Sequence, residues 1–241
     1  MEKKDLLKDV IKHIDIKSYN STELVDAMRN MSFTSRDTAR AADILMMMCK
    51  EKECTNILTL AGSTSAAGCM QVYVDMVRNK MIDVVVATGA SIIDMDLFEA
   101  LGFKHYIGEK ENVIPDTTLR DLYIDRIYDT YIDEEELQAC DHTTFEIANM
   151  LEARPYSSRE FIYEIGKWLH EGHAVKKDSL IQTCYECGVP IFVPAFSDSS
   201  AGFGIGKHQW ERMQKGEKYL SIDSVKDFVE LTQIKMQAPE T

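Results

Sequence analysis

The sequence lacks a surplus of positive charge. Its 27 lysine and arginine residues are outnumbered by 40 aspartate and glutamate residues, so the formal net charge at pH 7 is −13. Nucleic acids and anionic membranes are bound by basic surfaces that neutralise phosphate groups. We therefore predict no nucleic-acid partner and no membrane partner. Cationic ligands are compatible with this charge.

Long apolar runs are also missing. No stretch reaches the roughly 18 apolar residues of a membrane span, and the first residues, MEKKDLLKDVIKHIDIK, contain no apolar segment typical of a secretory signal. The six cysteines are too scattered for a disulfide framework in a chain of 241 residues: Cys49, Cys54, Cys69, Cys140, Cys184 and Cys187. These absences predict a cytoplasmic protein with reduced thiols.

Internal repeats and low-complexity linkers are absent, which favours one domain with a small appendage. A charged helix is predicted over residues 1–20, and a second, short helix begins near Thr22. Together they form an N-terminal helical segment over 1–34. After Ser35 the apolar residues follow the spacing of an amphipathic helix, and the main domain is predicted over 35–241.

Strands and helices alternate in the main domain. The pattern predicts apolar strands over 56–61, 83–88 and 190–196. It predicts helices over 69–80, 94–101, 143–152, 158–171, 178–187 and 221–236, and no clear element over 104–140. Right-handed crossovers between such strands give a Rossmann-like α/β fold, a parallel sheet with helices on both faces.

Small residues follow the first two strands. Between the first strand and its helix lies a loop from Gly62 to Gly68, which includes Ser63, Thr64, Ser65 and Ala66. Small side chains let backbone N–H groups approach a phosphate at a helix N-terminus. The alternative is a tight β–α turn selected for packing, since the loop is not G-x-G-x-x-G. Thr88, Gly89 and Ala90 close the second strand, and ligands of such sheets bind outside the carboxyl ends.

Aspartates also cluster at these strand ends. Asp94 and Asp96 follow the second strand, and helix capping is the alternative role that we favour for one of the two. Asp198 ends the third strand, where a carboxylate could bind ribose hydroxyls or a cationic substrate, or form a local Asx-turn. These positions are candidates for binding.

Two short motifs suggest metal or redox chemistry but have simpler explanations. Cys184-Tyr-Glu-Cys187 lies at the end of a predicted helix, with no second pair at zinc-like spacing. His170 and His173 are typical of a helix C-terminus, where positive charge is favourable. We predict no metal site.

Four blocks resemble the deoxyhypusine synthase family in order and spacing: NILTLAGSTSAAG, MIDVVVATGAS, ALGFKHYIG and GVPIFVPAFSDSSAGFG. The resemblance implies an NAD-dependent transferase of Rossmann-like fold, usually a homotetramer with active sites at dimer interfaces. In this family NAD oxidises a polyamine carbon, a lysine captures the aminobutyl group, and an amine accepts it. The acceptor is a protein lysine or a free diamine.

The resemblance assigns roles to positions in this sequence. It implies that NAD is bound by the loop Gly62–Ala66, by Thr88, Gly89 and Ala90, and by Asp198. It places a substrate-binding acid at Asp94. Phe203 stands where eukaryotic members carry an aspartate that holds the polyamine amine. The chain therefore looks more like the bacterial branch, with spermidine, putrescine or agmatine as donor.

The resemblance also implies a missing part. The family continues with an apolar strand, a Gly-Gly-Gly loop and the catalytic lysine, which are expected beyond Thr241, and Lys207 is not placed to replace that lysine. We therefore expect a C-terminally incomplete deoxyhypusine-synthase-like domain. The alternatives are a non-catalytic NAD-binding paralogue, one half of a split enzyme that forms a hetero-oligomer with a completing subunit, or an ordinary NAD-dependent dehydrogenase.

Overall fold

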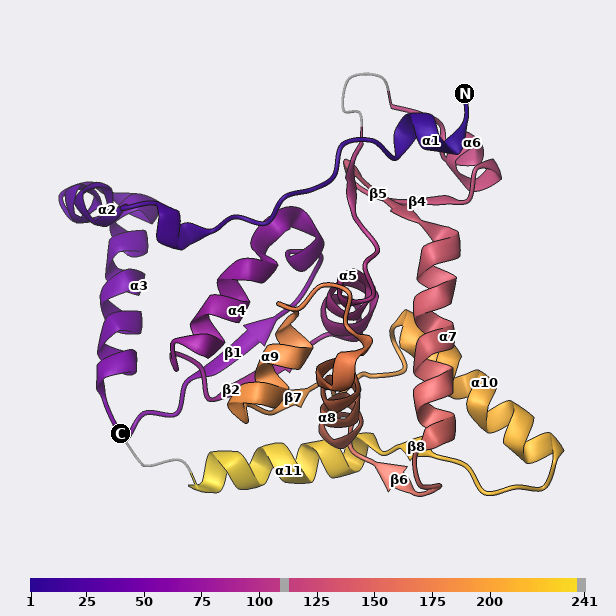
Figure 1. Ribbon diagram of the computed structural model, residues 1–241. Coiled ribbons are helices and arrows are strands. Elements are labelled where there is room, and N and C mark those ends of the chain that lie inside the picture. The colour runs from indigo at the N-terminus through magenta and orange to yellow at the C-terminus, as the bar shows by residue number, and fades with distance from the viewer. Residues whose placement is uncertain (109–112, 238–241) are drawn as a thin grey trace.

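A three-stranded parallel sheet forms the centre of the computed structural model, which describes residues 1–108 and 113–237 (Figure 1). Its order is β1 (Ile57–Leu60), β2 (Val84–Ala87) and β7 (Ile191–Phe192). Ile57 pairs with Val84, and Val85 pairs with Ile191, both in parallel. The three predicted strands and their parallel arrangement are confirmed. Each is shorter than predicted, and β7 most of all, because the chain turns at residues 194–197.

Helices cover both faces of this sheet and build the main core. The crossover helices are α4 (Met70–Arg78), the helical segment Ala90–Leu97 that continues into α5 (Phe98–Ala100), α8 (Ser158–Trp168) and α9 (Leu180–Cys187). Val74, Val85, Phe98, Phe161 and Phe192 are completely buried among them. Burial of such side chains is worth about 1.5–3 kcal/mol each, so the helices hold the sheet in place.

A second, smaller sheet lies within residues 104–140, for which the sequence predicted no clear element. Its order is β3 (Tyr106–Ile107), β5 (Thr130–Asp133) and β4 (Ile124–Ile127), all antiparallel, and α6 (Asp116–Asp121) precedes β4. It has its own core, in which Leu6 of α1 (Lys3–Leu6) packs with Leu119 and Tyr131. The strands are too short and too polar to show a two-residue period clearly.

Two long helices, α7 (Glu134–Met150) and α10 (Ser200–Gln214), pack against each other beside the sheet (Figure 1). The predicted helix over 143–152 begins much earlier, because the Asp133 side chain caps the backbone N–H groups of Glu135 and Glu136. Helix α10 was not predicted. The chain then forms β8 (Ser221–Ile222), which pairs with β6 (Pro155–Tyr156), and α11 (Ser224–Gln237).

The helix predicted over residues 1–20 is wrong. Only α1 and the short turn Ile16–Ser18 are helical there. The segment 9–17, here called the strap, is mostly extended because its backbone bonds to the main body: Ile107 N–H donates to Asp9 O at 2.7 Å, and Ile14 N–H donates to Gly68 O at 2.9 Å. These distant partners outweigh local helix formation.

Helices α2 (Thr22–Met28) and α3 (Phe33–Lys50) form a hairpin that stands to one side of the sheet (Figure 1). Both were predicted, and α3 begins slightly before Ser35. In α3 only Ala39 is buried. Within the ranges 1–108 and 113–237, no helix combines the length and the apolar character needed to cross a membrane.

Candidate functional site

The candidate site lies where the carboxyl ends of β1, β2 and β7 meet three turns. After β1 the chain turns at Gly62, whose φ of 71° is left-handed and favours glycine. The predicted loop is shorter than expected, because Ser65 already begins a helical turn that runs to Cys69 and leads into α4. Gly62 and Thr64 are exposed, whereas Ala66 is buried beneath the turn.

Ser91 joins the first two turns. Its hydroxyl donates to Gly62 O at 2.8 Å and lies 3.1 Å from Thr88 Oγ1. Ser65 Oγ in turn donates to Ser91 O at 3.3 Å. The hydroxyls of Ser65 and Thr88 therefore bond to the protein itself, and they fix the spacing between the two turns. Sequence reasoning missed Ser91, although a serine three residues after Thr88 was a usable signal.

Thr64 is also engaged, since its Oγ1 accepts a hydrogen bond from the Tyr73 hydroxyl at 2.8 Å. The side-chain donors suggested by the sequence are thus partly used for structure. The groups that the exposed side of this turn could present to a ligand are therefore mainly backbone N–H groups. The first N–H groups of a helical turn have no partner within the helix, and they carry its positive dipole end.

The third turn packs directly on the second. A Cβ at Gly89 would lie 2.6 Å from Ser199 Oγ and 3.5 Å from Asp198 O, so only glycine fits there. Ser199 is held by its own hydrogen bond from Oγ to Phe196 O, at 2.9 Å. The turn that carries Asp198 is therefore contiguous with the first two turns, through Gly89 and then Ser91.

Three aspartates from different elements approach one another beside these turns. Asp94 Oδ1 accepts the backbone N–H of Ser200 at 3.0 Å. Burial raises the pKa of Asp94, and the negative charge of Asp198 adds to this effect. Burial likewise raises the pKa of Asp141, on α7, to about 7, and Asp94 adds to it. Asp141 was not predicted, because the part of α7 that carries it was not recognised as helix.

Asp96 serves a different purpose from Asp94. It is buried, and its two carboxylate oxygens accept the backbone N–H groups of Leu180 and Ile181, each at 2.8 Å. It thus caps α9, which confirms the capping interpretation for one of the two aspartates. The helix that Asp96 caps is α9, and not the helical segment Ala90–Leu97 that contains it. Burial raises the pKa of Asp96 to about 6.

Phe203 lies on the first turns of α10 and is 77% exposed. Its assignment to substrate binding stays a prediction. The two short motifs lie elsewhere. His173 stacks on Trp168, with ring centroids 4.2 Å apart, and His170 Nδ1 lies 3.1 Å from Glu186 Oε1. Both histidines belong to the helical turn that ends α8, as predicted.

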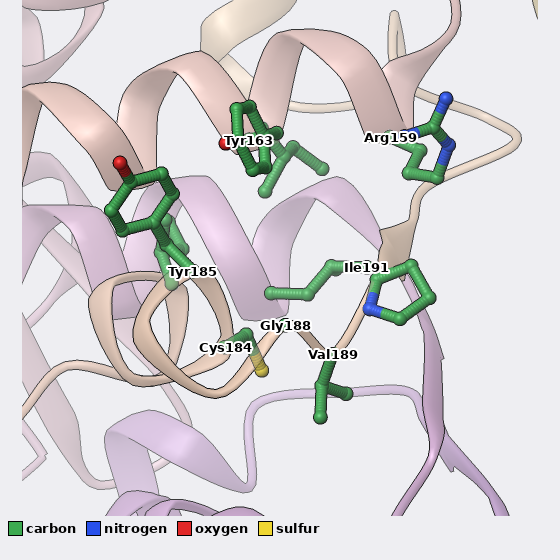
Figure 2. Close-up of a pocket in the computed structure, with 10 residues that line it drawn as sticks. Arg159, Tyr163, Cys184, Tyr185, Gly188, Val189 and Ile191 are labelled. Atoms are coloured by element: carbon green, nitrogen blue, oxygen red, sulfur yellow. The ribbon is translucent and has the colours of Figure 1, made fainter.

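A cavity of about 180 Å³ lies at the opposite end of β7 (Figure 2). Its walls are mainly apolar and include Ile162, Cys184, Val189 and Ile191, with Arg159 at one side. Burial raises the pKa of the Cys184 thiol well above its usual value. None of the residues predicted for the nucleotide lines this cavity.

Comparison with known proteins agrees with this architecture. The deoxyhypusine synthase family matches residues 23–241. A deoxyhypusine synthase-like protein from Caulobacter vibrioides is 64% identical over 240 residues, which are 100% of this chain and 65% of that protein. A probable deoxyhypusine synthase 2 from Methanosarcina acetivorans is 38% identical over 95% of this chain and 64% of its own length.

The fold resembles that of a solved structure as well. The crystal structure of a putative deoxyhypusine synthase from Entamoeba histolytica superposes with a TM-score of 0.63 at 19% identity, covering 95% of this chain and 78% of that one. At this identity the likeness concerns the fold alone. Because the family match extends over most of the sequence, the chain belongs to the deoxyhypusine synthase family.

Proposed function

We propose that this chain binds NAD at the carboxyl ends of β1, β2 and β7, and that it acts in the transfer of an aminobutyl-type group from a polyamine to an amine acceptor. One observation carries the proposal: the turns at Gly62, Gly89 and Asp198 form one contiguous surface through Ser91 and Ser199. Family membership supplies the reaction type, since a fold alone does not specify chemistry.

The first turn fits a dinucleotide. A Cβ at Gly62 would meet nothing within 4 Å, so there is open space beside its backbone, and the N–H groups of the helical turn that follows face an anion favourably. We assign the phosphates to the backbone of Gly62, Ser63 and Thr64. We assign ribose hydroxyls to the Asp198 carboxylate. Bound NAD would accept a hydride from the amine-bearing carbon of the donor.

The donor amine is assigned to the carboxylates of Asp94 and Asp141. Burial raises the pKa values of both groups. The charge of Asp198 adds to this effect at Asp94, the charge of Asp94 adds to it at Asp141, and a nearby ammonium ion relieves this repulsion. Phe203 adds no charge at the position where eukaryotic members carry an aspartate, so recognition of a terminal ammonium relies on fewer anions here. Spermidine, putrescine and agmatine are the donors to test.

A non-catalytic role in NAD binding is the second candidate. The turns at residues 61–65, 88–91 and 193–200 contain no lysine that could capture the transferred group. Lys207, on α10, lies over the Phe145 ring, with its Nζ 4.7 Å from the ring centroid. The proposed assembly is a homotetramer or a hetero-oligomer with a completing subunit, and in the hetero-oligomer the completing subunit would supply the lysine. The acceptor is a protein lysine or a diamine.

Calorimetric titration with NAD tests the binding site. We expect Asp198→Ala to weaken NAD binding about tenfold or more, because a charged hydrogen-bond partner contributes about 1.5–3 kcal/mol. Asp121→Ala, an exposed residue of α6, is the matched control and should bind as the parent does. Equal affinity of the Asp198→Ala variant and the parent would remove Asp198 from the site.

Mass spectrometry of products separates the two candidates. The chain is incubated with NAD and spermidine, putrescine or agmatine, and aminobutyl-bearing products are sought. Turnover by the chain alone supports the transferase. NAD binding without any product supports the non-catalytic role.

A further inference from the structure

The strap contacts the segment that follows the first candidate nucleotide turn. Ile14 N–H donates to Gly68 O at 2.9 Å, and a Cβ at Gly68 would lie 2.9 Å from Lys12 O. Further along, Lys17 Nζ donates to Asp75 Oδ1 on α4 at 2.7 Å. The extended backbone of the strap therefore lies directly against the end of the turn that we assign to NAD.

His13 makes the most informative contacts of the strap. Its Nδ1 lies 3.3 Å from the backbone nitrogen of Met70, the first residue of α4. Its Nε2 lies 2.6 Å from Glu99 Oε2 on α5. A backbone N–H can only donate, so Nδ1 is the acceptor and the ring proton is on Nε2. One imidazole thus connects the helix after the first turn with the helix after the second.

Glu99 is a firm anchor for this ring. Its side chain also binds His105 Nδ1 at 2.9 Å and Lys176 Nζ at 2.5 Å. Burial by itself would raise the pKa of Glu99. The hydrogen bonds from His105, His13 and Lys176 outweigh it, and the pKa lies well below its usual range. The carboxylate therefore stays charged at neutral and mildly acidic pH, and it holds Nε2 of His13 throughout.

We propose that His13 is a positioning residue of the nucleotide site, which fixes the helix after the Gly62 turn relative to the helix after the Gly89 turn. This inference rests on the proposed NAD binding. His13 acts through Met70 N–H and Glu99 and does not touch the nucleotide.

Three substitutions separate the two contacts of the His13 ring, the one with Met70 N–H and the one with Glu99. His13→Asn keeps a side-chain acceptor near the position of Nδ1, His13→Gln reaches toward Glu99 instead, and His13→Ala does neither. We expect NAD affinity to fall about tenfold in the Ala and Gln variants and less than threefold in the Asn variant, because only the Ala and Gln variants leave the Met70 N–H without its acceptor.

Lys12→Ala is the matched control on the same strap, because the Lys12 side chain is exposed and adjoins His13 in the sequence. The contact of Lys12 with Gly68 is made by its backbone oxygen, which the substitution keeps. Its NAD affinity should stay within twofold of the parent. Circular dichroism and Tm confirm that each variant is folded. If His13→Ala does not fold, the NAD affinities of the Asn and Gln variants test the proposal. Equal affinities of these two variants would contradict it.

Rescue by the Asn variant provides a readout that simple loss of stability would not change. Glu99, His105 and Lys176 remain in all three variants, so the variants differ only in what residue 13 can accept or donate. If His13 only stabilised the fold, the Asn and Gln variants would lose NAD affinity to the same extent.

Hydrogen exchange distinguishes failure of this inference from failure of the proposed function. Amide protection over residues 65–76 should decrease in His13→Ala, even without nucleotide. Unchanged NAD affinity and unchanged protection in that variant would overturn the positioning role. If the parent does not bind NAD but the protection still decreases, the proposed function is wrong and the positioning role of His13 stands.

Discussion

The two edges of the parallel sheet differ in chemistry. At the carboxyl edge, the three turns are tied together by hydroxyls and by the close approach of Gly89 to Ser199. At the amino edge of β7, a mainly apolar cavity lies between α8 and α9 (Figure 2). The helical segments that follow β1 and β2 begin at the first edge, so their unpaired N–H groups lie there, whereas α9 ends at the second edge. The walls of the cavity at the second edge are mainly apolar, so the first edge is the better candidate for an anionic cofactor.

The largest effect is expected from adding one methyl group at the carboxyl edge. In Gly89→Ala the new Cβ would overlap Ser199, and relief requires the Asp198 turn to move. We expect a loss of about 1–3 kcal/mol in the free energy of unfolding and at least a tenfold loss of NAD affinity. Urea denaturation and calorimetry measure the two quantities.

Gly188→Ala is the counterpart at the amino edge. Gly188 has a φ of 72°, and a Cβ there would meet nothing within 4 Å, so the substitution costs about 1 kcal/mol of backbone strain alone. Its NAD affinity should equal that of the parent. If both glycine variants lost NAD affinity to the same extent, the distinction between the two edges would not hold.

A smaller effect on stability is expected from Asp141, and it depends on pH. The folded-state pKa is about 7, above the usual aspartate value near 4. Between these values the folded protein binds more protons than the unfolded chain, so this group's contribution to stability falls as pH rises. The parent should therefore lose on the order of 1 kcal/mol relative to Asp141→Asn between pH 5 and pH 8, after allowing for solvent screening.

Urea denaturation of both proteins at several pH values measures this difference. A difference that stays constant from pH 5 to pH 8 would mean that Asp141 is ionised throughout that range. The assignment of Asp141 to the donor amine would then lose its electrostatic support.

The smallest effect is expected from Cys184→Ala at the amino edge. The thiol lines the apolar cavity and is 1% exposed, and its removal enlarges the cavity by a single atom. We expect a loss of up to about 1 kcal/mol in stability and no change in NAD affinity. A loss of NAD affinity in this variant would indicate that the cavity communicates with the carboxyl edge.

The centre of the fold could be predicted from sequence because its signals are local. Strands β1 and β2 are short apolar runs followed by glycine, and the turns at Gly62 and Gly89 are visible as small residues after a strand. The two turns meet because parallel strands end at the same edge. The contact between Gly89 and the Asp198 turn follows from the strand order, which the sequence does not state.

The periphery was harder because distant partners determine its structure. Residues 9–17 have helical composition but bond to residues near 68 and 105, which no local pattern reveals. Helix α10 was missed because Gly202, Gly204 and Gly206 lower its helix propensity. Gly204 is needed there, because a Cβ would lie 2.5 Å from Asp141 O on α7. Tertiary packing overrides propensity in both places.

The cluster of side chains around the Glu99 carboxylate affects the order in which contacts can form during synthesis of the chain. His13, His105 and Lys176 all bind this one carboxylate, although 163 residues separate the first from the last. A growing chain releases the N-terminal residues first, yet their full set of partners exists only after Lys176 has left the ribosome. Local α-helical hairpins form early, and contacts of long sequence separation form late. The strap can bond to residues near 68 and 105 earlier, but the Glu99 carboxylate that holds His13 acquires its third partner only then.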